Sequence, residues 1–207
     1  MRKVALITDG WRRLFTYAWP AGILQRIRET GEDVNLYIFN STGNWSRDAG
    51  YNRAEYNIYN LPELSDFDGI ILELNNISSP AVLADVISNA KRSGRPVVSI
   101  ANELGDFYYV GIDNYSAMKQ VIAHLHEVHD CKKFWLLVGA QDNYESSCRL
   151  QGMLDYAKEH KIKIDKDDIW YGSFDYKSGL EGYKHLWDRH KELPDAVICI
   201  NDNVAVA

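Results

Sequence analysis

The sequence lacks the long apolar runs and the basic clusters that mark several large classes of protein. No stretch approaches the ~20 consecutive apolar residues of a membrane helix, and the apolar run after Lys3 is too short for the core of a signal peptide. Lysine and arginine nowhere occur more than two in a row, and the net charge is −6. Because nucleic-acid phosphates are bound by clustered cations, we expect no nucleic acid as a partner of this chain. The lack of a long apolar run likewise argues against a membrane as a partner.

Cysteine is scarce, and no pattern of disulfides is indicated. The three cysteines, Cys131, Cys148 and Cys199, are an odd number and lack the spacing of metal ligands. This usage fits a reducing compartment, so we expect a cytoplasmic protein.

Several signatures of α/β enzymes are also missing. The sequence has no GxxxxGK[ST] phosphate loop, no GxGxxG after its first strand pattern and no GxSxG nucleophile elbow. His124, His126 and His129 precede Cys131, but positions 124 and 126 face different sides of a helix, which favours surface histidines over a zinc site. We therefore expect no cofactor, no metal and no catalytic residues.

The residues that are present alternate between strand and helix patterns. The hydrophobic content of 46% is ample for a packed core. A helix is expected to end near Thr30 with Pro20 in its first turn, and Ser178 with Glu181 forms a predicted capping box. This alternation predicts an α/β fold with parallel sheets and helices on both faces. Strands are expected at 3–8, 34–39, 68–74, 96–101, 108–112, 134–138, 169–172 and 196–200.

The stretch Tyr109 to Tyr115, which reads YVGIDNY, lies near the midpoint of the chain. Asp113 and Asn114 are both good helix caps between a short strand and an amphipathic helix. The local sequence pattern leaves two interpretations of this stretch open. The stretch is either a crossover between two Rossmann-like lobes, 1–111 and 112–207, or one more strand-loop-helix unit in a single sheet. Because the chain stops within one turn of a predicted cap, we expect the second lobe to be incomplete.

Polar and aromatic residues follow the expected strands. Open parallel sheets bind ligands at the carboxyl ends of their strands, and aromatic faces combined with Arg, Asn and carboxylate groups suit a hydroxyl-rich ligand such as a sugar or polyol. The same residues also fit ordinary roles, with Asn201 as a helix cap and Phe174 as a packed side chain. The candidate ligand-binding residues are Asp9, Trp11, Tyr17, Glu145, Arg149, Phe174 and Asn201.

Motifs in the chain resemble, in order, those of the lactose-repressor type of ligand-binding module, which has the type 1 periplasmic-binding-protein fold. The first half adds two strand segments, FDGIIL and RPVVSI. The second-half motifs are VGIDN at Val110–Asn114, AHLHEVHDCKKFWLLVG at Ala123–Gly139, SCRLQG at Ser147–Gly152 and PDAVICINDNVA at Pro194–Ala205.

The resemblance implies roles for individual residues. Arg149 corresponds to the arginine that grips the ligand, and Phe174 to the aromatic residue against the ligand ring. Asp113 and Asn114 correspond to the hinge. Glu145 stands where some relatives have a hydroxyl residue, which suggests a cationic or hydrogen-bond-donating ligand. The loop that begins at Asp9 also departs from the family pattern, and this leaves the identity of the ligand open.

The resemblance also implies a sensory binding module of a bacterial signalling or transcription-regulatory protein. Ligand-induced lobe closure would be passed to an attached output domain, either a GGDEF diguanylate cyclase or an AraC-type DNA-binding domain, and a homodimer is expected. No helix-turn-helix pattern precedes Val4. Two alternatives remain open. One is an enzyme with Asp9, Glu145 or His129 as acid-base groups, and the other is a ligand-free dimerisation module.

Overall fold

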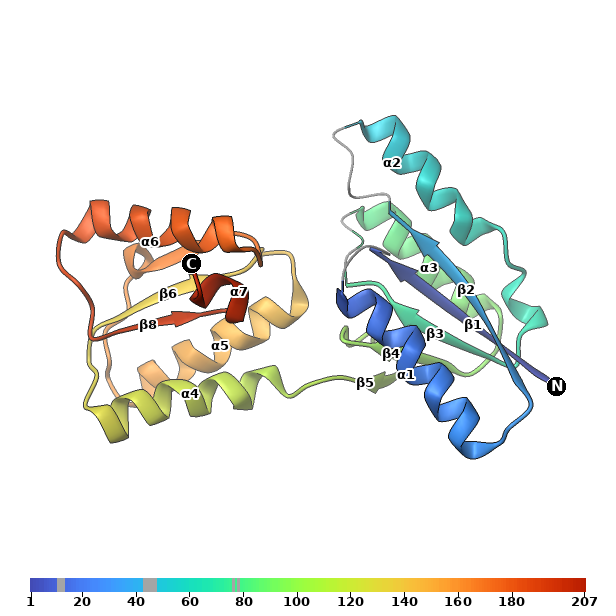
Figure 1. Ribbon diagram of the computed structural model, residues 1–207, viewed down its shortest axis with the longest axis horizontal. Helices are drawn as coiled ribbons and strands as arrows, with labels where there is room; N and C mark the ends of the chain where they lie inside the picture. Colours follow the sequence, from blue (N-terminus) through green and yellow to red (C-terminus); the bar gives the residue numbers. More distant parts are fainter. Residues whose placement is uncertain (11–13, 43–47, 76, 78) are drawn as a thin grey trace. The chain divides into compact units, whose positions relative to one another are not determined.

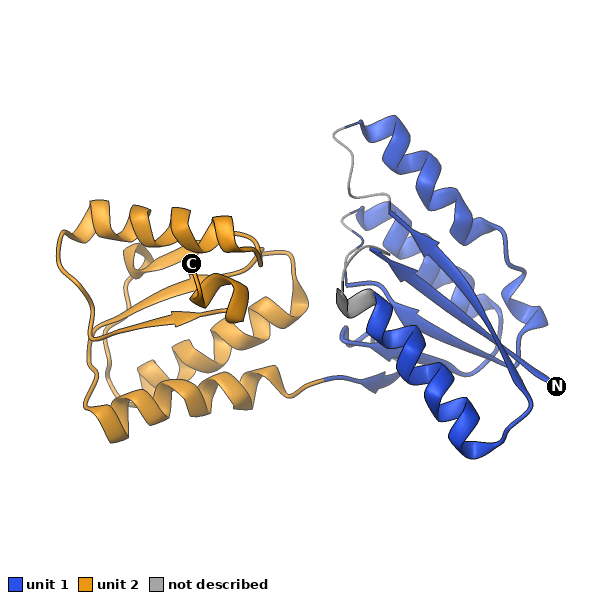
Figure 2. Cartoon of the chain, in the orientation of Figure 1, with its two compact units in different colours: residues 1–111 blue, residues 112–207 orange. Residues whose placement is uncertain are grey.

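The computed structural model describes residues 1–10, 14–42, 48–75, 77 and 79–207. The chain divides into two compact units, Met1–Gly111 and Ile112–Ala207 (Figure 2). Each unit has its own sheet and its own hydrophobic core. The predicted α/β class, with parallel strands and flanking helices, is confirmed (Figure 1).

Unit 1 contains a five-stranded parallel sheet in the order β2-β1-β3-β4-β5. The apolar run after Lys3 forms the central part of β1, where the last five residues are buried. This burial explains the continuous apolar pattern, because a strand inside a parallel sheet is covered on both faces. The strands are β1 Arg2–Asp9, β2 Val34–Ser41, β3 Gly69–Glu73, β4 Val97–Ile100 and β5 Tyr108–Val110.

Helices α1 and α3 cover opposite faces of the unit 1 sheet (Figure 1). Helix α3 begins as predicted, with Ser79 as its cap and Pro80 as its first residue. The predicted end of α1 at Thr30 is confirmed, but Pro20 is not in its first turn, because the helix already begins at Leu14 and Pro20 lies in its interior. Proline removes one backbone bond there, and burial of its ring offsets part of that loss. The helices are α1 Leu14–Thr30, α2 Ala49–Glu55 and α3 Pro80–Arg92, with 3₁₀ helices at Tyr56–Asn60 and Leu64–Asp66.

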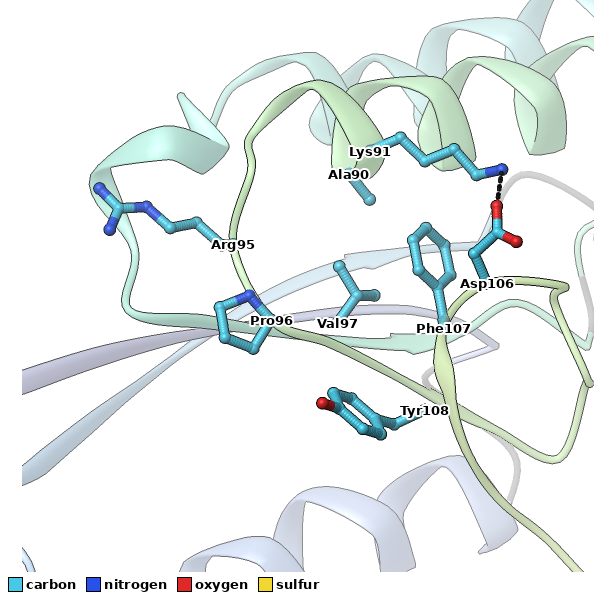
Figure 3. A pocket seen from close by; sticks show the side chains of 8 residues that line it. All are labelled: Ala90, Lys91, Arg95, Pro96, Val97, Asp106, Phe107 and Tyr108. Atoms are coloured by element: carbon cyan, nitrogen blue, oxygen red, sulfur yellow. Dashed lines mark hydrogen bonds and ion pairs between the residues drawn. The ribbon is translucent and has the colours of Figure 1, made fainter.

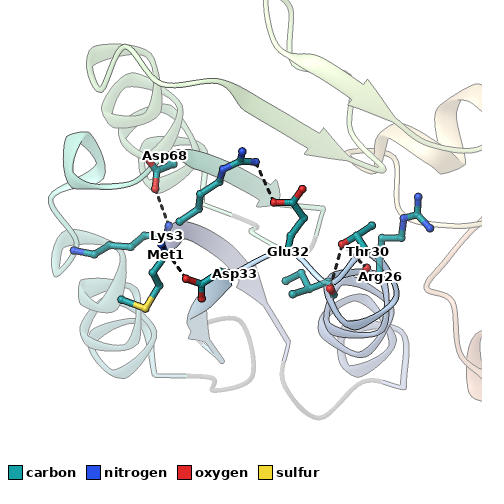
Figure 4. Close-up of polar contacts among 9 residues, drawn as sticks. Met1, Lys3, Arg26, Thr30, Glu32, Asp33 and Asp68 are labelled. Atoms are coloured by element: carbon teal, nitrogen blue, oxygen red, sulfur yellow. Dashed lines mark hydrogen bonds and ion pairs between the residues drawn. The ribbon is translucent and has the colours of Figure 1, made fainter.

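Polar contacts join the amino end of β1 to the turn before β2 and to the residue before β3 (Figure 4). The amino group of Met1 lies 3.0 Å from a carboxylate oxygen of Asp33. The backbone N–H of Lys3 donates to the carboxylate of Asp68 at 2.8 Å. These groups are exposed, so their contacts add little stability. At the opposite, carboxyl end of the sheet lies the candidate residue Asp9, the last residue of β1.

Unit 2 contains a three-stranded parallel sheet in the order β7-β6-β8. All five residues of the central strand β6 are buried. Helices α4 and α5 lie together on one face of the sheet, and α6 lies on the other (Figure 1). The strands are β6 Phe134–Val138, β7 Ile169–Tyr171 and β8 Ala196–Cys199. The helices are α4 Asn114–His129, α5 Tyr144–Glu159, α6 Tyr176–His190 and α7 Asp202–Ala205, with a 3₁₀ helix at Lys166–Asp168.

The predicted capping box of α6 is wrong. Its cap is Asp175, whose carboxylate accepts from the backbone N–H of Ser178 at 2.8 Å. Ser178 is inside the helix, and its hydroxyl oxygen accepts from the backbone N–H of Ser173 at 2.9 Å. Across the part of the chain that the structure describes, no helix is both long enough and apolar enough to cross a membrane.

Candidate ligand-binding site

Capping side chains fix the helix starts at the carboxyl ends of the unit 2 strands. Asn143 accepts from the N–H of Ser146 at 2.9 Å after β6, and Asn201 accepts from the N–H of Val204 at 3.0 Å after β8. Each cap satisfies a backbone donor that the helix itself leaves unpaired. The first turns of α5 and α7 are thereby held beside the strand ends.

The two predicted hinge residues have different surroundings. Asp113 is exposed and caps α4, with the backbone N–H of Ser116 donating to it at 2.9 Å. That backbone bond, together with the hydroxyl of Ser116, lowers the pKa of the Asp113 carboxyl below its ordinary value. Asn114 is only 4% exposed, so its polar side chain must find its partners inside the protein.

Asn114 joins two of the predicted ligand-binding residues, Arg149 and Glu145. The side-chain oxygen of Asn114 accepts from Nε of Arg149 at 2.7 Å, and its nitrogen lies 3.3 Å from a carboxylate oxygen of Glu145. Arg149 also donates through Nη1 to the backbone oxygen of Ile200 at 2.7 Å. One buried amide therefore brings together a cation and an anion that project from the same face of α5.

Phe174 and Asn201 lie at the same end of the unit 2 sheet. The side-chain nitrogen of Asn201 donates to the backbone oxygen of Phe174 at 3.0 Å. A Cβ at Gly139 would lie 2.5 Å from two ring atoms of Phe174, so the ring sits against the backbone just after β6. Both residues thus have the ordinary roles, capping and packing, that the sequence left open. Four of the predicted residues, Glu145, Arg149, Phe174 and Asn201, gather at this edge.

In unit 1, a buried polar cluster lies where β1 and β3 end. Asp9 is fully buried, and the hydroxyl of Thr8 donates to the carboxylate of Glu73 at 2.7 Å. The hydroxyl of Tyr59 donates to the backbone oxygen of Thr8 at 2.8 Å. Burial, and then the charge of Asp9, raise the pKa of Tyr59 far above its ordinary value. This cluster explains the burial of Asp9 as part of a polar core under the sheet edge.

Two further predicted residues belong to unit 1, Trp11 and Tyr17. Tyr17 is 64% exposed on α1, and Trp11 lies outside the described residues. Sequence reasoning missed Glu73, although it is the one charged residue in the apolar stretch GIILEL and could have been found on that basis. Tyr59 gave no such signal, because its partner is distant in sequence.

Two shallow pockets occur near the sheet ends. One of about 260 Å³ is formed at the amino ends of β4 and β5, where Lys91 and Asp106 form an ion pair at 3.0 Å beside the ring of Phe107 (Figure 3). Parallel sheets bind ligands at the other end of their strands. The second, of about 390 Å³, lies at the carboxyl ends of β6 and β7. Its lining is Gln141, Ser146, Ser147, Leu150, Gln151 and Tyr171.

The histidines of α4 do not gather around a common centre. His124 and His129 face each other with their Nε2 atoms 3.2 Å apart, whereas Nδ1 of His126 contacts the hydroxyl of Tyr156 at 3.1 Å. In the portion described, no group of three or more His, Cys, Asp or Glu side chains could hold a metal ion.

Comparison with known proteins finds curated relatives of similar sequence. Catabolite control protein A from Staphylococcus xylosus is 31% identical over 153 residues, which cover 73% of this chain and 44% of that protein. The HTH-type transcriptional regulator CelR from Thermobifida fusca is 30% identical over 99 residues, or 48% of this chain and 28% of that protein. The chain thus spans less than half the length of these curated relatives.

Solved structures agree in fold over nearly the whole chain. A putative transcriptional regulator LacI from Bacillus cereus subsp. cytotoxis has a TM-score of 0.75 at 20% identity, covering 100% of this chain and 71% of its own. The complex of the transcriptional regulator CelR with cellobiose has a TM-score of 0.70 at 24% identity, and the match covers 98% of this chain and 59% of the CelR chain. At these identities the likeness shows the fold.

The family itself is shown by the match of residues 52–207 to the family described as "Periplasmic binding proteins and sugar binding domain of LacI family". The resemblance found in the VGIDN and SCRLQG motifs is therefore confirmed. This chain belongs to the periplasmic binding proteins and sugar-binding domains of the LacI family.

Proposed function

We propose that this chain is a sensory domain that binds a small hydroxyl-rich ligand, a sugar or a polyol, and regulates transcription through an attached output domain. The observation that carries the proposal is the arrangement of Arg149 and Glu145 on the buried amide of Asn114, at the carboxyl end of the unit 2 sheet. The family match and the sugar complex of the structural relative CelR support the same ligand class.

Arg149 has the hydrogen-bonding capacity that such a ligand requires. A guanidinium carries five N–H donors. Within the described residues, Arg149 uses one N–H on Asn114 and one on Ile200, and the other three are available to ligand oxygens. The carboxylate of Glu145 can accept from ligand hydroxyls, while an aromatic ring such as that of Phe174, at the same sheet end, suits the apolar face of a sugar ring.

We further propose that the two units are the two lobes of the sensor. Ligand binding would favour one arrangement of the lobes over others, because a ligand shifts an equilibrium toward the state that it binds more tightly. Asp113 and Asn114 immediately follow the boundary between the units, which makes them suitable hinge residues. The proposed output is DNA binding, since the curated relatives are transcriptional regulators. A diguanylate cyclase output would be the result that corrects this part of the proposal.

The ligand is sought by thermal shift and calorimetry on the 207-residue chain, with glucose, galactose, cellobiose, mannitol and ribose as probes. A ligand at 100 times its dissociation constant should stabilise the folded chain by about 2.7 kcal/mol. The absence of any stabilisation by every one of these compounds would refute the proposed ligand class.

A variant of Arg149 tests whether binding uses the proposed site. Loss of a charged hydrogen-bonding group costs about 1.5–3 kcal/mol, so Arg149→Ala should weaken binding roughly 10- to 150-fold. The matched control is Arg189→Ala, which removes an exposed arginine of α6 that forms an ion pair with Asp167. It should leave the affinity unchanged. Equal affinities for both variants would place the ligand elsewhere.

We also propose a homodimer. Helix α1 supports this, because Tyr17 is 64% exposed and Leu24 is 36% exposed on its surface. Light scattering of the purified chain measures the molar mass directly, and a monomer at micromolar concentration would reject the dimer.

A further inference from the structure

The amide of Asn114 makes more bonds than a hinge residue or a helix cap requires. Its oxygen accepts from Nε of Arg149, and its nitrogen lies 3.3 Å both from Glu145 and from the backbone oxygen of Ile112. The orientation of the amide follows from chemistry, because a guanidinium can only donate and a carboxylate can only accept. Reversing the amide would set nitrogen against guanidinium and oxygen against carboxylate.

These bonds restrict Arg149 at two points. Nε is held by Asn114, and Nη1 is held by the backbone oxygen of Ile200. A free arginine side chain loses substantial rotamer entropy when it binds a ligand, whereas one already held in place loses little. The guanidinium is thus oriented before a ligand arrives.

The opposite charges of Glu145 and Arg149 also affect which ligand groups can bind beside them. Glu145 and Arg149 are four residues apart on α5, and both are bonded to the one amide. A ligand group beside them meets an acceptor that is anionic and a donor that is cationic. Adjacent hydroxyls can donate to the carboxylate and accept from the guanidinium. A phosphate or a carboxylate would gain the attraction of Arg149 but suffer the repulsion of Glu145.

We propose that Asn114 is a positioning residue that fixes Arg149 and Glu145 as an oriented donor–acceptor pair, and that this pair selects uncharged ligands with adjacent hydroxyls over anionic sugars. The selectivity rests on the proposed function, whereas the positioning role does not. Asn114 acts through its two neighbours and does not itself need to touch the ligand. Its bond to Ile112 also ties the pair to the first residue after the unit boundary.

The positioning role can be measured without any ligand. Proton–nitrogen NMR detects the Nε–H groups of arginines, and the signal of Arg149 is identified by its loss in Arg149→Lys. We expect this N–H to exchange with solvent at least tenfold more slowly than those of the exposed arginines. Asn114→Ala should remove that protection. The double variant Asn114→Asp with Glu145→Gln, which keeps an acceptor for Nε and removes the facing carboxylate, should retain most of it, and Asn203→Ala at an exposed position in α7 should have no effect.

Fast exchange of the Arg149 Nε–H in the wild-type chain, or unchanged protection in a folded Asn114→Ala, would overturn the positioning role. Backbone spectra show whether each variant folds. If Asn114→Ala does not fold, the wild-type exchange rate and the spectrum of the double variant decide the question, because loss of protection in a folded double variant also contradicts the proposal.

The selectivity is measured by calorimetry with glucose, galactose and cellobiose against glucose 6-phosphate, gluconate and galacturonate. We expect the wild-type chain to bind at least one uncharged sugar ten or more times tighter than its anionic counterpart, and Glu145→Gln to reduce this ratio at least tenfold. Anionic sugars that bind equally well, or a ratio that Glu145→Gln leaves unchanged, would refute the selectivity while leaving the sensor function intact. Binding of no compound in either set would instead refute the proposed function, and the NMR result would still decide the role of Asn114.

Discussion

A side chain at Gly152 would overlap the backbone carbonyl of Tyr115, because helix α5 crosses α4 at that point with almost no space between them. Tyr115 is next to Asn114, and Gly152 lies one turn after Arg149. The close approach of the two backbones therefore sets the distance across which Asn114 and Arg149 hydrogen-bond.

Gly152→Ala should force α4 and α5 apart. Overpacking of this kind costs about 1–3 kcal/mol, and the loss should appear as a lower urea midpoint. Gly22→Ala in α1 is the matched control, since nothing lies within 4 Å of its added Cβ and alanine favours a helix interior by about 0.8–1 kcal/mol. A Gly152→Ala chain as stable as Gly22→Ala would contradict the close approach.

Gly139→Ala should displace the ring of Phe174, which lies 2.5 Å from the position of the new Cβ. Because Asn114 and Arg149 are not touched, we expect weaker sugar binding with the Arg149 Nε–H still protected from exchange. Calorimetry and the NMR experiment on the same sample separate the two effects. Unchanged affinity would remove Phe174 from the list of ligand contacts.

Thr8→Val should destabilise unit 1 by about 1–3 kcal/mol, because it takes a hydroxyl donor from the buried carboxylate of Glu73. Urea unfolding gives the change, and hydrogen exchange should show it first in β1 and β3. Thr30→Val at the exposed end of α1 is the control, with an expected effect within about 0.5 kcal/mol. Equal effects at both positions would argue against a bond that stabilises the core.

The stability of the chain should fall between pH 10 and pH 12 partly through Tyr156. Burial raises the pKa of its hydroxyl to about 12, and its bond to Glu127 adds to the shift. The folded-state pKa is above the unfolded value of about 10, so the stabilisation is complete below pH 10 and is lost as the pH rises through 12. Urea midpoints across this range should fall less steeply for Tyr156→Phe than for wild type.

Tyr176→Phe, at an exposed position in α6, is the control for this pH experiment and should follow the wild-type curve. If Tyr156→Phe also follows that curve, Tyr156 does not contribute to the alkaline loss of stability.

Strands could be predicted well from the sequence because their signal is local. Phe134–Val138 has the same bounds in the prediction and in the structure, since five apolar residues in a row, preceded by Lys133 and followed by Gly139, leave little choice for where the strand begins and ends. The first residues of helices were harder to predict. Asp175 and Ser178 are both good caps, and the choice fell to Asp175 because Ser178 is used by the backbone N–H of Ser173.

The candidate site was only partly predictable for a similar reason. Glu145, Arg149, Phe174 and Asn201 could be named because they follow strands or match family motifs, and the structure brings them to one end of the unit 2 sheet. The shared role of Asn114 depends on contacts with residues 31 and 35 positions away, which no local pattern contains.

The caps of α5, α6 and α7 are Asn143, Asp175 and Asn201, whose side-chain oxygens bind backbone N–H groups. Glu145 lies in the first turn of α5 and is bonded to Asn114. Replacing it would cost the ~0.3–1 kcal/mol that an acidic residue gains at a helix start, together with the contribution of its hydrogen bond to Asn114, about 1.5–3 kcal/mol for a bond to a charged group. We therefore expect substitutions of Glu145 to change the proposed ligand preference at some cost in stability, while the starts of these three helices stay fixed by their own caps.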